Sequence, residues 1–330
     1  MAPTNTAAWL PAARAHPMKV DAAEYPVVGD SEVVVKVSAI ALNPMDWLIQ
    51  ALGERLFSWL QYPYVGGTDV AGIVVELGGQ VTKYKVGDRV LGLATGFTPR
   101  EGAFQTYTVL RSNVSTHIPD SLSFRDAAVL PLGLCTAASG LYRKDFLALQ
   151  YPTAKPVPTG KTLLVWAGAS SVGTNAIQLA VASGYENWDY CMAAGASRVF
   201  DYRSDTVVQD LIAAFKGRTC AGGLAIQRGS EQPTFDVVAN SEGSKFVAVA
   251  GPVPDQVPRE IQAKMIFGSS LKDNEVGSKV FDDFLAGALA DGKYQCLPKP
   301  MLVGHGLETL QDAMDRGLAG TSAEKLVVEI

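Results

Sequence analysis

The sequence predicts an α/β protein built from an antiparallel, barrel-like β domain and a doubly wound parallel sheet. Two observations carry this prediction. Short β segments separated by glycine-rich turns fill the first third of the 330 residues, and strand-like and helical segments alternate after about residue 125. Many short strands are typical of antiparallel barrels, whereas strands alternating with helices are typical of a parallel sheet.

The expected strands of the first third are rich in β-branched residues. They span Glu32–Ile40, Val70–Leu77 and Asp88–Leu93. Glycine and proline pairs mark the turns that separate them. These turns are Asn43-Pro44, Gly66-Gly67, Gly78-Gly79, Val86-Gly87-Asp88 and Pro119-Asp120.

The later part begins with an Ala- and Leu-rich segment, Arg125–Tyr142, which we expect to be helical behind the caps Ser121 and Ser123. After a proline-rich link, an apolar strand at Thr162–Trp166 leads through a small-residue turn into a helix at Thr174–Ser183. The pattern predicts further strands at Arg198–Tyr202, Phe235–Ala239 and Lys245–Ala250, and further helices at Thr206–Phe215, Ser278–Ala290 and Leu307–Arg316.

Composition narrows the function to a small-molecule activity. Hydrophobic residues make up 48% and charged residues 18%, which excludes a disordered chain. The net charge of -5, without a basic run, argues against a nucleic-acid partner. No apolar run reaches the roughly 20 residues of a membrane span, and the first residues lack a signal-peptide core, so we expect a cytoplasmic protein with no membrane partner.

The glycine-rich turn Ala167–Gly173 (AGASSVG) is the strongest chemical motif. Small residues between a strand and a helix let a pyrophosphate approach the backbone N–H groups of the helix N-terminus, where the helix dipole favours anions. The hydroxyls of Ser170 and Ser171 are additional donors. A strict GxGxxG pattern is absent, and close strand–helix packing is the structural alternative.

Cysteine and histidine are too dispersed for a metal or disulfide framework. Four cysteines and three histidines occur without a CxxC or HxxxH pair. We therefore expect reduced thiols and no metal site.

Seven segments in this order resemble one family over nearly the whole chain. They are Leu42–Trp47, Gly66–Gly72, Lys85–Val90, Gly102–Tyr107, Leu130–Ala137, the turn Ala167–Gly173 and Gly195–Val199. In this order they resemble the medium-chain dehydrogenase/reductase superfamily, and within it the zinc-free quinone oxidoreductases and fungal trans-acting enoyl reductases.

The resemblance implies a GroES-like barrel domain with an inserted Rossmann domain. We expect the GroES-like domain at 1–130, the Rossmann domain at 131–290 and a return to the GroES-like domain at 291–330. It further implies NADPH as cofactor and a monomer or homodimer.

Zinc is testable position by position. The alcohol dehydrogenases of this superfamily carry a Cys-His pair where this chain has Asn43-Pro44, and Gly-His-Glu where it has Gly67-Thr68-Asp69. Without thiolate and imidazole ligands we expect no zinc. Hydride transfer to a polarised C=C, in an enone or an enoyl thioester, or to a quinone then becomes the expected reaction. A polyketide pathway, with a polyketide synthase as partner, is the implied context.

By resemblance, Asn43, Asp46 and Trp47 line the substrate side. The expected cofactor-binding residues are Thr136 beside the carboxamide, Ser170, Ser171, Val172 and Gly173 at the pyrophosphate, Tyr202 at the adenosine ribose or its 2′-phosphate, and Asn240, Phe267 and Gly268 at the nicotinamide half. Structural alternatives stand beside them, because Asp46 is suited to a turn cap, Trp47 to the core and Tyr202 to a strand end. The residues nominate no catalytic acid.

One segment departs from the family pattern. Between the helix ending at Ser183 and Gly195, where the second Rossmann strand belongs, no β-branched run occurs, and Asn187 and Gly195 instead predict a helix at Trp188–Ala194. The second Rossmann strand is therefore expected to be shortened or missing. A lost exon end, an omitted stretch and a rebuilt sheet are three open explanations. The departure motivates rival functions, a cofactor-poor binding protein or a non-redox isomerase or lyase on the same fold.

Overall fold

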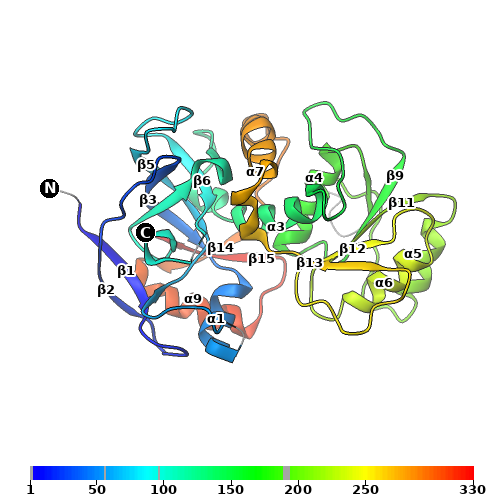
Figure 1. The fold of residues 1–330 in the computed structure, drawn as a ribbon, viewed down its shortest axis with the longest axis horizontal. Coiled ribbons are helices and arrows are strands. Elements are labelled where there is room, and N and C mark those ends of the chain that lie inside the picture. Colours follow the sequence, from blue (N-terminus) through cyan, green and yellow to red (C-terminus); the bar gives the residue numbers. More distant parts are fainter. Residues whose placement is uncertain (1–2, 56, 96, 189–193) are drawn as a thin grey trace. The chain divides into compact units, whose positions relative to one another are not determined.

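The computed structural model describes residues 3–55, 57–95, 97–188 and 194–330. The chain divides into two compact units, the first formed by Met1–Leu132 with Cys296–Ile330 and the second by Gly133–Gln295 (Figure 1). The first unit is discontinuous in sequence and the second is inserted into it. The expected α/β architecture is confirmed.

The first unit is mostly β-structure. Its strands are β1 (Asn5–Leu10), β2 (Lys19–Ala23), β3 (Glu32–Ala41), β4 (Tyr64–Val65), β5 (Asp69–Leu77), β6 (Arg89–Leu93), β7 (Tyr107–Arg111), β8 (Ser115–His117), β14 (Lys299–His305) and β15 (Glu324–Glu329). Its helices are α1 (Pro44–Leu52), α2 (Phe124–Ala127) and α9 (Leu310–Ala319), with short 3-10 turns at Gly53–Arg55, Pro99–Glu101, Ser112–Val114 and Leu307–Thr309.

Strand β3 lies at the centre of this unit. It pairs antiparallel with β5, β7 and β15, so β15, from the returning C-terminal segment, lies in the same sheet as β3 and β5, whereas β1 and β2 form a separate sheet with β4. The register places Val327 opposite Ala41, and Ala41 opposite Asp69. Because β-branched residues of β3 and β5 pack into one buried cluster, the alternation in the sequence predicted these strands correctly.

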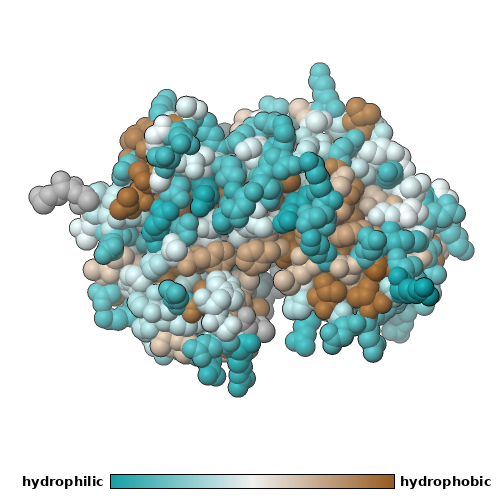
Figure 2. All heavy atoms as spheres, in the orientation of Figure 1, coloured by the Kyte–Doolittle hydropathy of each residue, from teal (hydrophilic) through white to brown (hydrophobic). Residues whose placement is uncertain are grey.

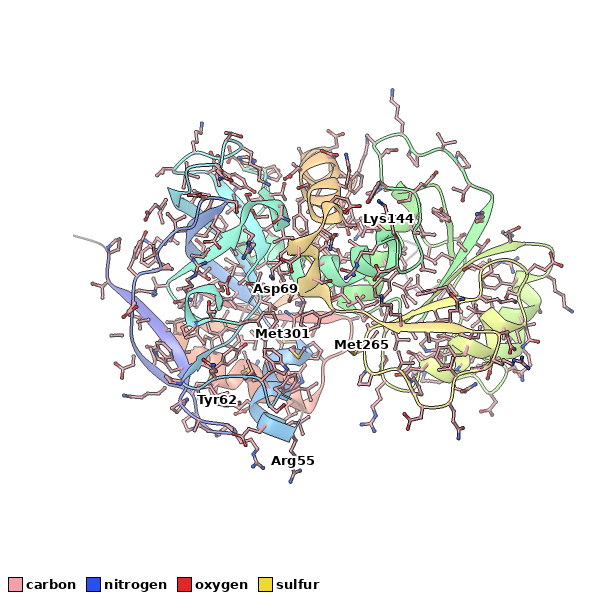
Figure 3. All side chains as sticks on the ribbon, in the orientation of Figure 1. Arg55, Tyr62, Asp69, Lys144, Met265 and Met301 are labelled. Atoms are coloured by element: carbon pink, nitrogen blue, oxygen red, sulfur yellow. The ribbon has the colours of Figure 1, made fainter. Side chains whose placement is uncertain are left out.

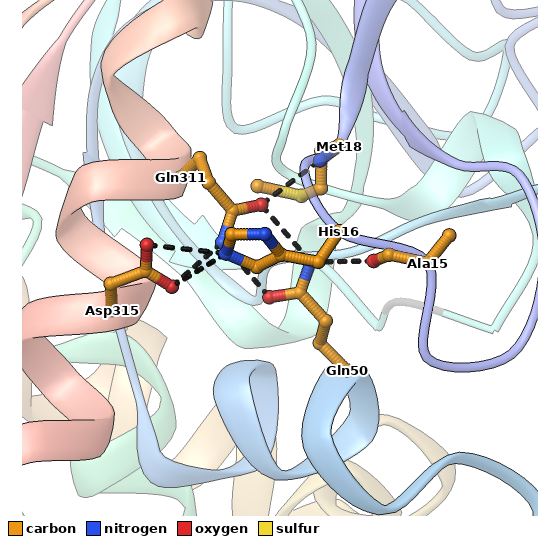
Figure 4. Close-up of polar contacts among 6 residues, drawn as sticks. All are labelled: Ala15, His16, Met18, Gln50, Gln311 and Asp315. Atoms are coloured by element: carbon orange, nitrogen blue, oxygen red, sulfur yellow. Dashed lines mark hydrogen bonds and ion pairs between the residues drawn. The ribbon is translucent and has the colours of Figure 1, made fainter.

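Polar contacts tie the N-terminal segment to α9 (Figure 4). The Met18 N–H donates to Gln311 Oε1 at 2.9 Å, and His16 Nε2 lies 3.1 Å from Asp315 Oδ1. These contacts fix the first strands against the returning C-terminal helix.

The second unit alternates strands and helices. Its strands are β9 (Lys161–Val165), β10 (Glu186–Trp188), β11 (Thr219–Ala225), β12 (Phe246–Val249) and β13 (Gln262–Met265). Its helices are α3 (Pro131–Tyr142), which begins in the first unit, α4 (Ser171–Ala182), α5 (Val207–Phe215), α6 (Glu231–Ala239), the 3-10 turn Gly268–Asp273, α7 (Glu275–Val280), the π-helical turn Phe281–Leu285 and α8 (Ala286–Ala290).

All five strands run parallel in the order β10-β9-β11-β12-β13. Helices α5 and α6 lie on one face of this sheet, and α3 and α4 lie on the other (Figure 1). The second strand, β10, spans Glu186–Trp188 among the described residues, which end there before resuming at residue 194, so the expected shortening stays a prediction. Parallel strands end at one common edge, called here the carboxyl edge, where ligands bind in doubly wound sheets.

Beyond the glycine-rich turn, one expected strand is a helix and one strand was not expected. Phe235–Ala239 belongs to helix α6, and the strand before it is β11, Thr219–Ala225, which the sequence did not predict. A short apolar run fits a buried helix as well as a strand. The glycines and alanines of β11 hide its character, and Gly222 sits at a bulge with φ of 116°.

The segment around β10 also differs from expectation. Arg198–Tyr202 forms no strand; a turn begins at Asp201, whose Oδ1 accepts the Arg203 N–H at 3.0 Å. Trp188 belongs to β10 rather than to the expected helix Trp188–Ala194, and residues 189–193 lie outside the described residues.

The helix expected at Arg125–Tyr142 is two helices. Helix α2 ends at Ala127 and α3 begins at Pro131, because a proline lacks the N–H that a continuing helix requires and is favoured at a first helical position.

Hydrophilic residues cover most of the face drawn in Figure 2, and apolar residues gather there in separate patches. Among the described residues, no helix combines the length and the hydropathy needed to cross a bilayer.

Candidate functional site

The glycine-rich turn joins β9 to α4 at the carboxyl edge of the parallel sheet. Ser170 is the N-cap of α4; its Oγ accepts the Gly173 N–H at 3.1 Å and donates to the Ala167 carbonyl at 2.7 Å. The Ser170 hydroxyl thus uses its hydrogen bonds within the turn. It therefore stabilises the backbone that a pyrophosphate would approach, rather than binding the pyrophosphate directly.

Gly173 is required by the close packing of this turn. A Cβ atom at this position would lie 2.3 Å from the Ala167 carbonyl oxygen and 2.7 Å from the Gly168 Cα atom. Real side chains do not approach backbone atoms this closely. The last glycine of the motif therefore lets the start of α4 press against the end of β9.

Ala167 adopts an unusual backbone conformation, with φ of 62°. An L-residue in this left-handed region costs about 1–2 kcal/mol. We therefore expect Ala167→Gly to raise the free energy of unfolding by about 0.5–1 kcal/mol, after the larger entropy of an unfolded glycine is subtracted. Urea unfolding measures the change. Ala169→Gly, at a position without a positive φ, is the matched control and should destabilise; equal effects of the two substitutions would contradict the strain at Ala167.

The start of α4 fits an anionic group. The helix has 12 residues, and its N-terminal end carries the positive end of the helix dipole. Among the described residues, the Val172 N–H has no hydrogen-bond acceptor. The small side chains of Ala167, Gly168 and Ala169 leave the backbone of the turn approachable. The residues present therefore fit the phosphates of a dinucleotide.

Helix α3 brings Thr136 to the same edge. A Cβ atom on Gly133 would lie 2.4 Å from Ser171 Oγ, and one on Gly140 would lie 2.9 Å from Ile266 Cδ1. Glycines on α3 thus pack against the residues that follow β9 and β13, and Thr136 lies between these two contacts. Thr136 is partly exposed on an otherwise buried helix.

The other expected cofactor residues do not all lie at the carboxyl edge of the sheet. Phe267 and Gly268 follow β13 at the carboxyl edge, and Phe267 is exposed. Asn240 instead caps the C-terminal end of α6, and its Nδ2 donates to the Asp236 carbonyl at 2.8 Å. Because α6 leads into the start of β12, this position belongs to the opposite edge of the sheet.

The sequence predicted no site residue after β11, where two residues reach the carboxyl edge. Ile226 and Gln227 follow β11 at the carboxyl edge, two strands from β13. The signal for them is the charged and polar run that begins at Gln227, directly after seven small and apolar residues.

Tyr202 borders a small apolar hollow beside the end of β9. The Arg203 guanidinium lies 5.9 Å from the centre of the Tyr202 ring and is ion-paired with Asp201 at 3.0 Å. Tyr202 is 60% exposed, so it is not a buried strand-end tyrosine. The hollow is lined by Leu164, Val165, Trp166, Phe200, Tyr202, Val207 and Leu211.

A buried charge cluster lies in the first unit. Asp69, at the start of β5, is 0% exposed (Figure 3). Its carboxylate accepts the Leu132 N–H at 2.6 Å and the Asn43 Nδ2 hydrogen at 2.9 Å, and it is ion-paired with Lys325 Nζ at 2.8 Å. These contacts join β5, the start of α1 and the last strand, β15.

Asn43 is held from both ends of its amide. Its Oδ1 accepts from Lys325 Nζ at 2.7 Å, whereas its Nδ2 donates to Asp69 and to Thr68 Oγ1, the latter at 3.0 Å. Since an ammonium only donates and a carboxylate only accepts, these partners fix which way the amide points.

Asp46 anchors the backbone around this cluster. Its Oδ2 accepts the Asn43 N–H at 2.7 Å, and the Gly67 N–H also donates to its carboxylate. Burial raises the pKa of Asp46 to about 7, and the nearby negative charge of Asp69 also raises it. The two backbone hydrogen bonds lower the pKa of Asp46, but their effect is smaller than that of burial. The turn-cap alternative for Asp46 describes its contacts here.

Trp47 packs inside the first unit. A Cβ atom on Gly317 of α9 would lie 2.4 Å from Trp47 Cε3, so the indole covers that glycine. Trp47 is only partly buried against the core. Its assignment to the substrate side stays a prediction.

The comparisons identify the family. Residues 29–120 match the family described as Alcohol dehydrogenase GroES-like domain. Dehydrogenase pigH of Monascus ruber is 46% identical over 369 residues, which cover 99% of this chain and 100% of that protein. Trans-enoyl reductase himH of Aspergillus japonicus is 37% identical over 339 residues, covering 99% of this chain and 97% of that protein. The chain belongs to the medium-chain dehydrogenase/reductase superfamily.

The superfamily fold is also seen in three dimensions. The solved structure of CurK enoyl reductase superposes with a TM-score of 0.76 at 18% identity, over 98% of this chain and 99% of that one. The resemblance inferred from the ordered segments is therefore confirmed. Members of this superfamily are nicotinamide-dependent oxidoreductases, and the small-residue turn of the second unit fits the dinucleotide they use.

The positions compared above with the zinc ligands of the superfamily carry an amide, a hydroxyl and a carboxylate in this chain. Within the described ranges of the chain, no three His, Cys, Asp or Glu side chains are grouped to hold a metal ion. Asn43 and Thr68 stand where zinc-dependent members carry ligands, and the Asp69 carboxylate is paired with the Lys325 ammonium. Metal independence stays a prediction with its own test.

Proposed function

We propose that this protein is a zinc-independent, NADPH-dependent reductase that delivers hydride to the β-carbon of an enone or enoyl thioester, or to a quinone. The observation that carries the proposal is the turn at Ala167–Gly173, where a capped helix N-terminus and close packing at Gly173 open the backbone to a pyrophosphate. The trans-enoyl reductase name of the relative from Aspergillus japonicus supports the substrate class.

Bound NADPH would supply the hydride in this reaction. The Val172 N–H would bind a phosphate at the start of α4, while Ser170 and Gly173 keep the turn in shape. Thr136, Phe267 and Gly268 border the carboxyl edge and position the nicotinamide half. Tyr202, with the cationic Arg203 over its ring, faces the adenosine end.

Hydrogen-bond donors replace a Lewis acid in this proposal. Reduction of a conjugated C=C or a quinone builds negative charge on a carbonyl oxygen, and polar groups held in place by the fold stabilise such charge. The first unit supplies a fixed polar array at Asn43, Thr68 and Lys325. A polyketide synthase would supply the acyl chain as a thioester in the cytoplasm.

A titration with NADPH tests the proposal. We expect saturable quenching of tryptophan fluorescence, because Trp166 adjoins the turn, and oxidation of NADPH only when an enone or quinone is added. Activity should survive dialysis against a chelator, since no bound metal is required. Absence of both binding and turnover would overturn the proposal, and loss of turnover that zinc restores would overturn its metal-free part.

A cofactor-poor binding protein is the second candidate function. The sequence between Ser183 and Gly195 favours it, because this segment lacks the β-branched run of a second Rossmann strand, whose end commonly contacts the adenosine ribose. The same titration separates the two, since this candidate predicts no saturable NADPH binding.

A further inference from the structure

The side chain of Thr68 links the buried charge cluster to the surface. Asp69 and Lys325 are 0% and 5% exposed, and Asn43 is 3% exposed, whereas Thr68 is partly exposed. Thr68 Oγ1 accepts from Asn43 Nδ2 at 3.0 Å. The cation, the amide and the hydroxyl thus form a chain from Lys325 inside to Thr68 at the surface.

The direction of the Thr68 proton follows from its partners. The Asn43 amide presents its nitrogen to Thr68, because its oxygen accepts from the Lys325 ammonium at 2.7 Å. A hydroxyl that accepts from an amide N–H must point its own proton elsewhere. Among the described residues, no acceptor for this proton is found, so the hydroxyl can donate it to a bound ligand.

The backbone holds Thr68 rigidly. Its carbonyl accepts the Ala94 N–H at 2.8 Å, and the Gly67 carbonyl accepts the Ala103 N–H at 3.0 Å. Gly67 has φ of 84°, and a Cβ atom there would lie 2.3 Å from the Phe104 ring. Only glycine fits at this position, and the hydroxyl that follows is held in one place.

We propose that the Thr68 hydroxyl donates a hydrogen bond to the carbonyl oxygen of the substrate. The inference rests on the proposed function and adds a residue to it. When hydride reaches the β-carbon, the C=C electron pair shifts and the carbonyl oxygen becomes an enolate oxygen. Water then protonates the α-carbon, while Thr68 keeps its proton and only hydrogen-bonds the oxygen. The buried Lys325 cation, acting through Asn43, strengthens this donor.

Asp46 is the competing group, and its contacts argue against it. Its carboxylate is 5% exposed and accepts the Asn43 and Gly67 N–H groups. A substrate carbonyl needs a donor that reaches the surface, and Thr68 provides one.

A chromophoric enal tests this role without any cofactor. The absorbance of 4-(dimethylamino)cinnamaldehyde moves to longer wavelength when its carbonyl oxygen accepts a strong hydrogen bond. We expect this red shift with the wild-type protein, its loss with Thr68→Val, which removes the hydroxyl at nearly constant volume, and its recovery with Thr68→Ser. Thr82→Val, at an exposed loop threonine, is the control and should keep the shift.

Kinetics supply the second readout. We expect Thr68→Val to lower kcat for an enone by about 100-fold with little change in KM, as for loss of one oxyanion donor. No red shift with the wild-type protein, or a Thr68→Val variant that keeps both shift and kcat, would overturn the inference. A red shift that depends on Thr68 in a protein without NADPH turnover would overturn only the proposed function. Thermal melting of each variant shows that the fold is intact.

Discussion

Replacing Lys325 by methionine should lower the free energy of unfolding by about 3–5 kcal/mol. Methionine fills a similar volume, but it leaves the fully buried Asp69 carboxylate without its cation at 2.8 Å. A buried charge that has lost its partner keeps its desolvation cost and loses the compensating attraction. Asn43 Oδ1 also loses its donor, so the amide orientation is no longer fixed. Urea unfolding at constant pH measures the change.

Two comparisons isolate the charge. Lys19→Met removes an exposed ion pair with Asp21, which contributes at most about 1 kcal/mol, and should change little. The double variant Lys325→Met/Asp69→Asn removes both buried charges and should regain part of the loss, because no unpaired ion remains. A Lys325→Met protein as stable as the Lys19→Met protein would contradict the assignment of a buried ion pair.

The pH dependence of stability should show the buried carboxyl of Asp46. Burial raises its pKa from 3.8 to about 7, so between these values the folded protein binds a proton that the unfolded chain has released. The contribution of Asp46 to the free energy of unfolding is therefore largest below about pH 4. It decreases as the pH rises from there through about 7, where the folded protein also releases the proton. The total change is about 4 kcal/mol.

Asp46→Asn removes this titration. Asparagine keeps one acceptor oxygen for the Asn43 and Gly67 N–H groups, so the variant starts less stable at acid pH. Its stability should then fall less than that of the wild type between about pH 4 and pH 8. Urea unfolding of both proteins across this range gives the difference. Parallel pH profiles would show that Asp46 titrates normally and is not buried as described.

Much of the fold followed from local patterns. A pattern within ten residues was enough to predict each of β3, β5 and β6, which have β-branched runs. The same holds for the small-residue turn before α4. Helix α6 and strand β11 did not, because their apolar runs are too short to distinguish a helical period from a buried strand.

The site was predictable only in part for a different reason. The residues of the dinucleotide turn are contiguous, whereas the charge cluster gathers Asn43, Asp69 and Lys325 from distant parts of the chain. The pairing of β15 with β3, and of β3 with β5, brings them together. A lysine at the start of the apolar run KLVVEI was its one sequence signal, and a lone lysine at a strand end is ordinarily solvated.

The sheet position of β15 also sets the order in which the protein is completed during synthesis. Gly133–Gln295 is continuous, so the second unit has all its strands once residue 295 has left the ribosome. The first unit, although its first segment precedes the second unit in sequence, lacks β14, β15 and the Lys325 cation until residues 299–329 emerge. Domains usually complete in order from the N-terminus. Here the nascent chain must carry an unfinished first unit, in which Asp69 lacks its cation, until β15 has left the ribosome.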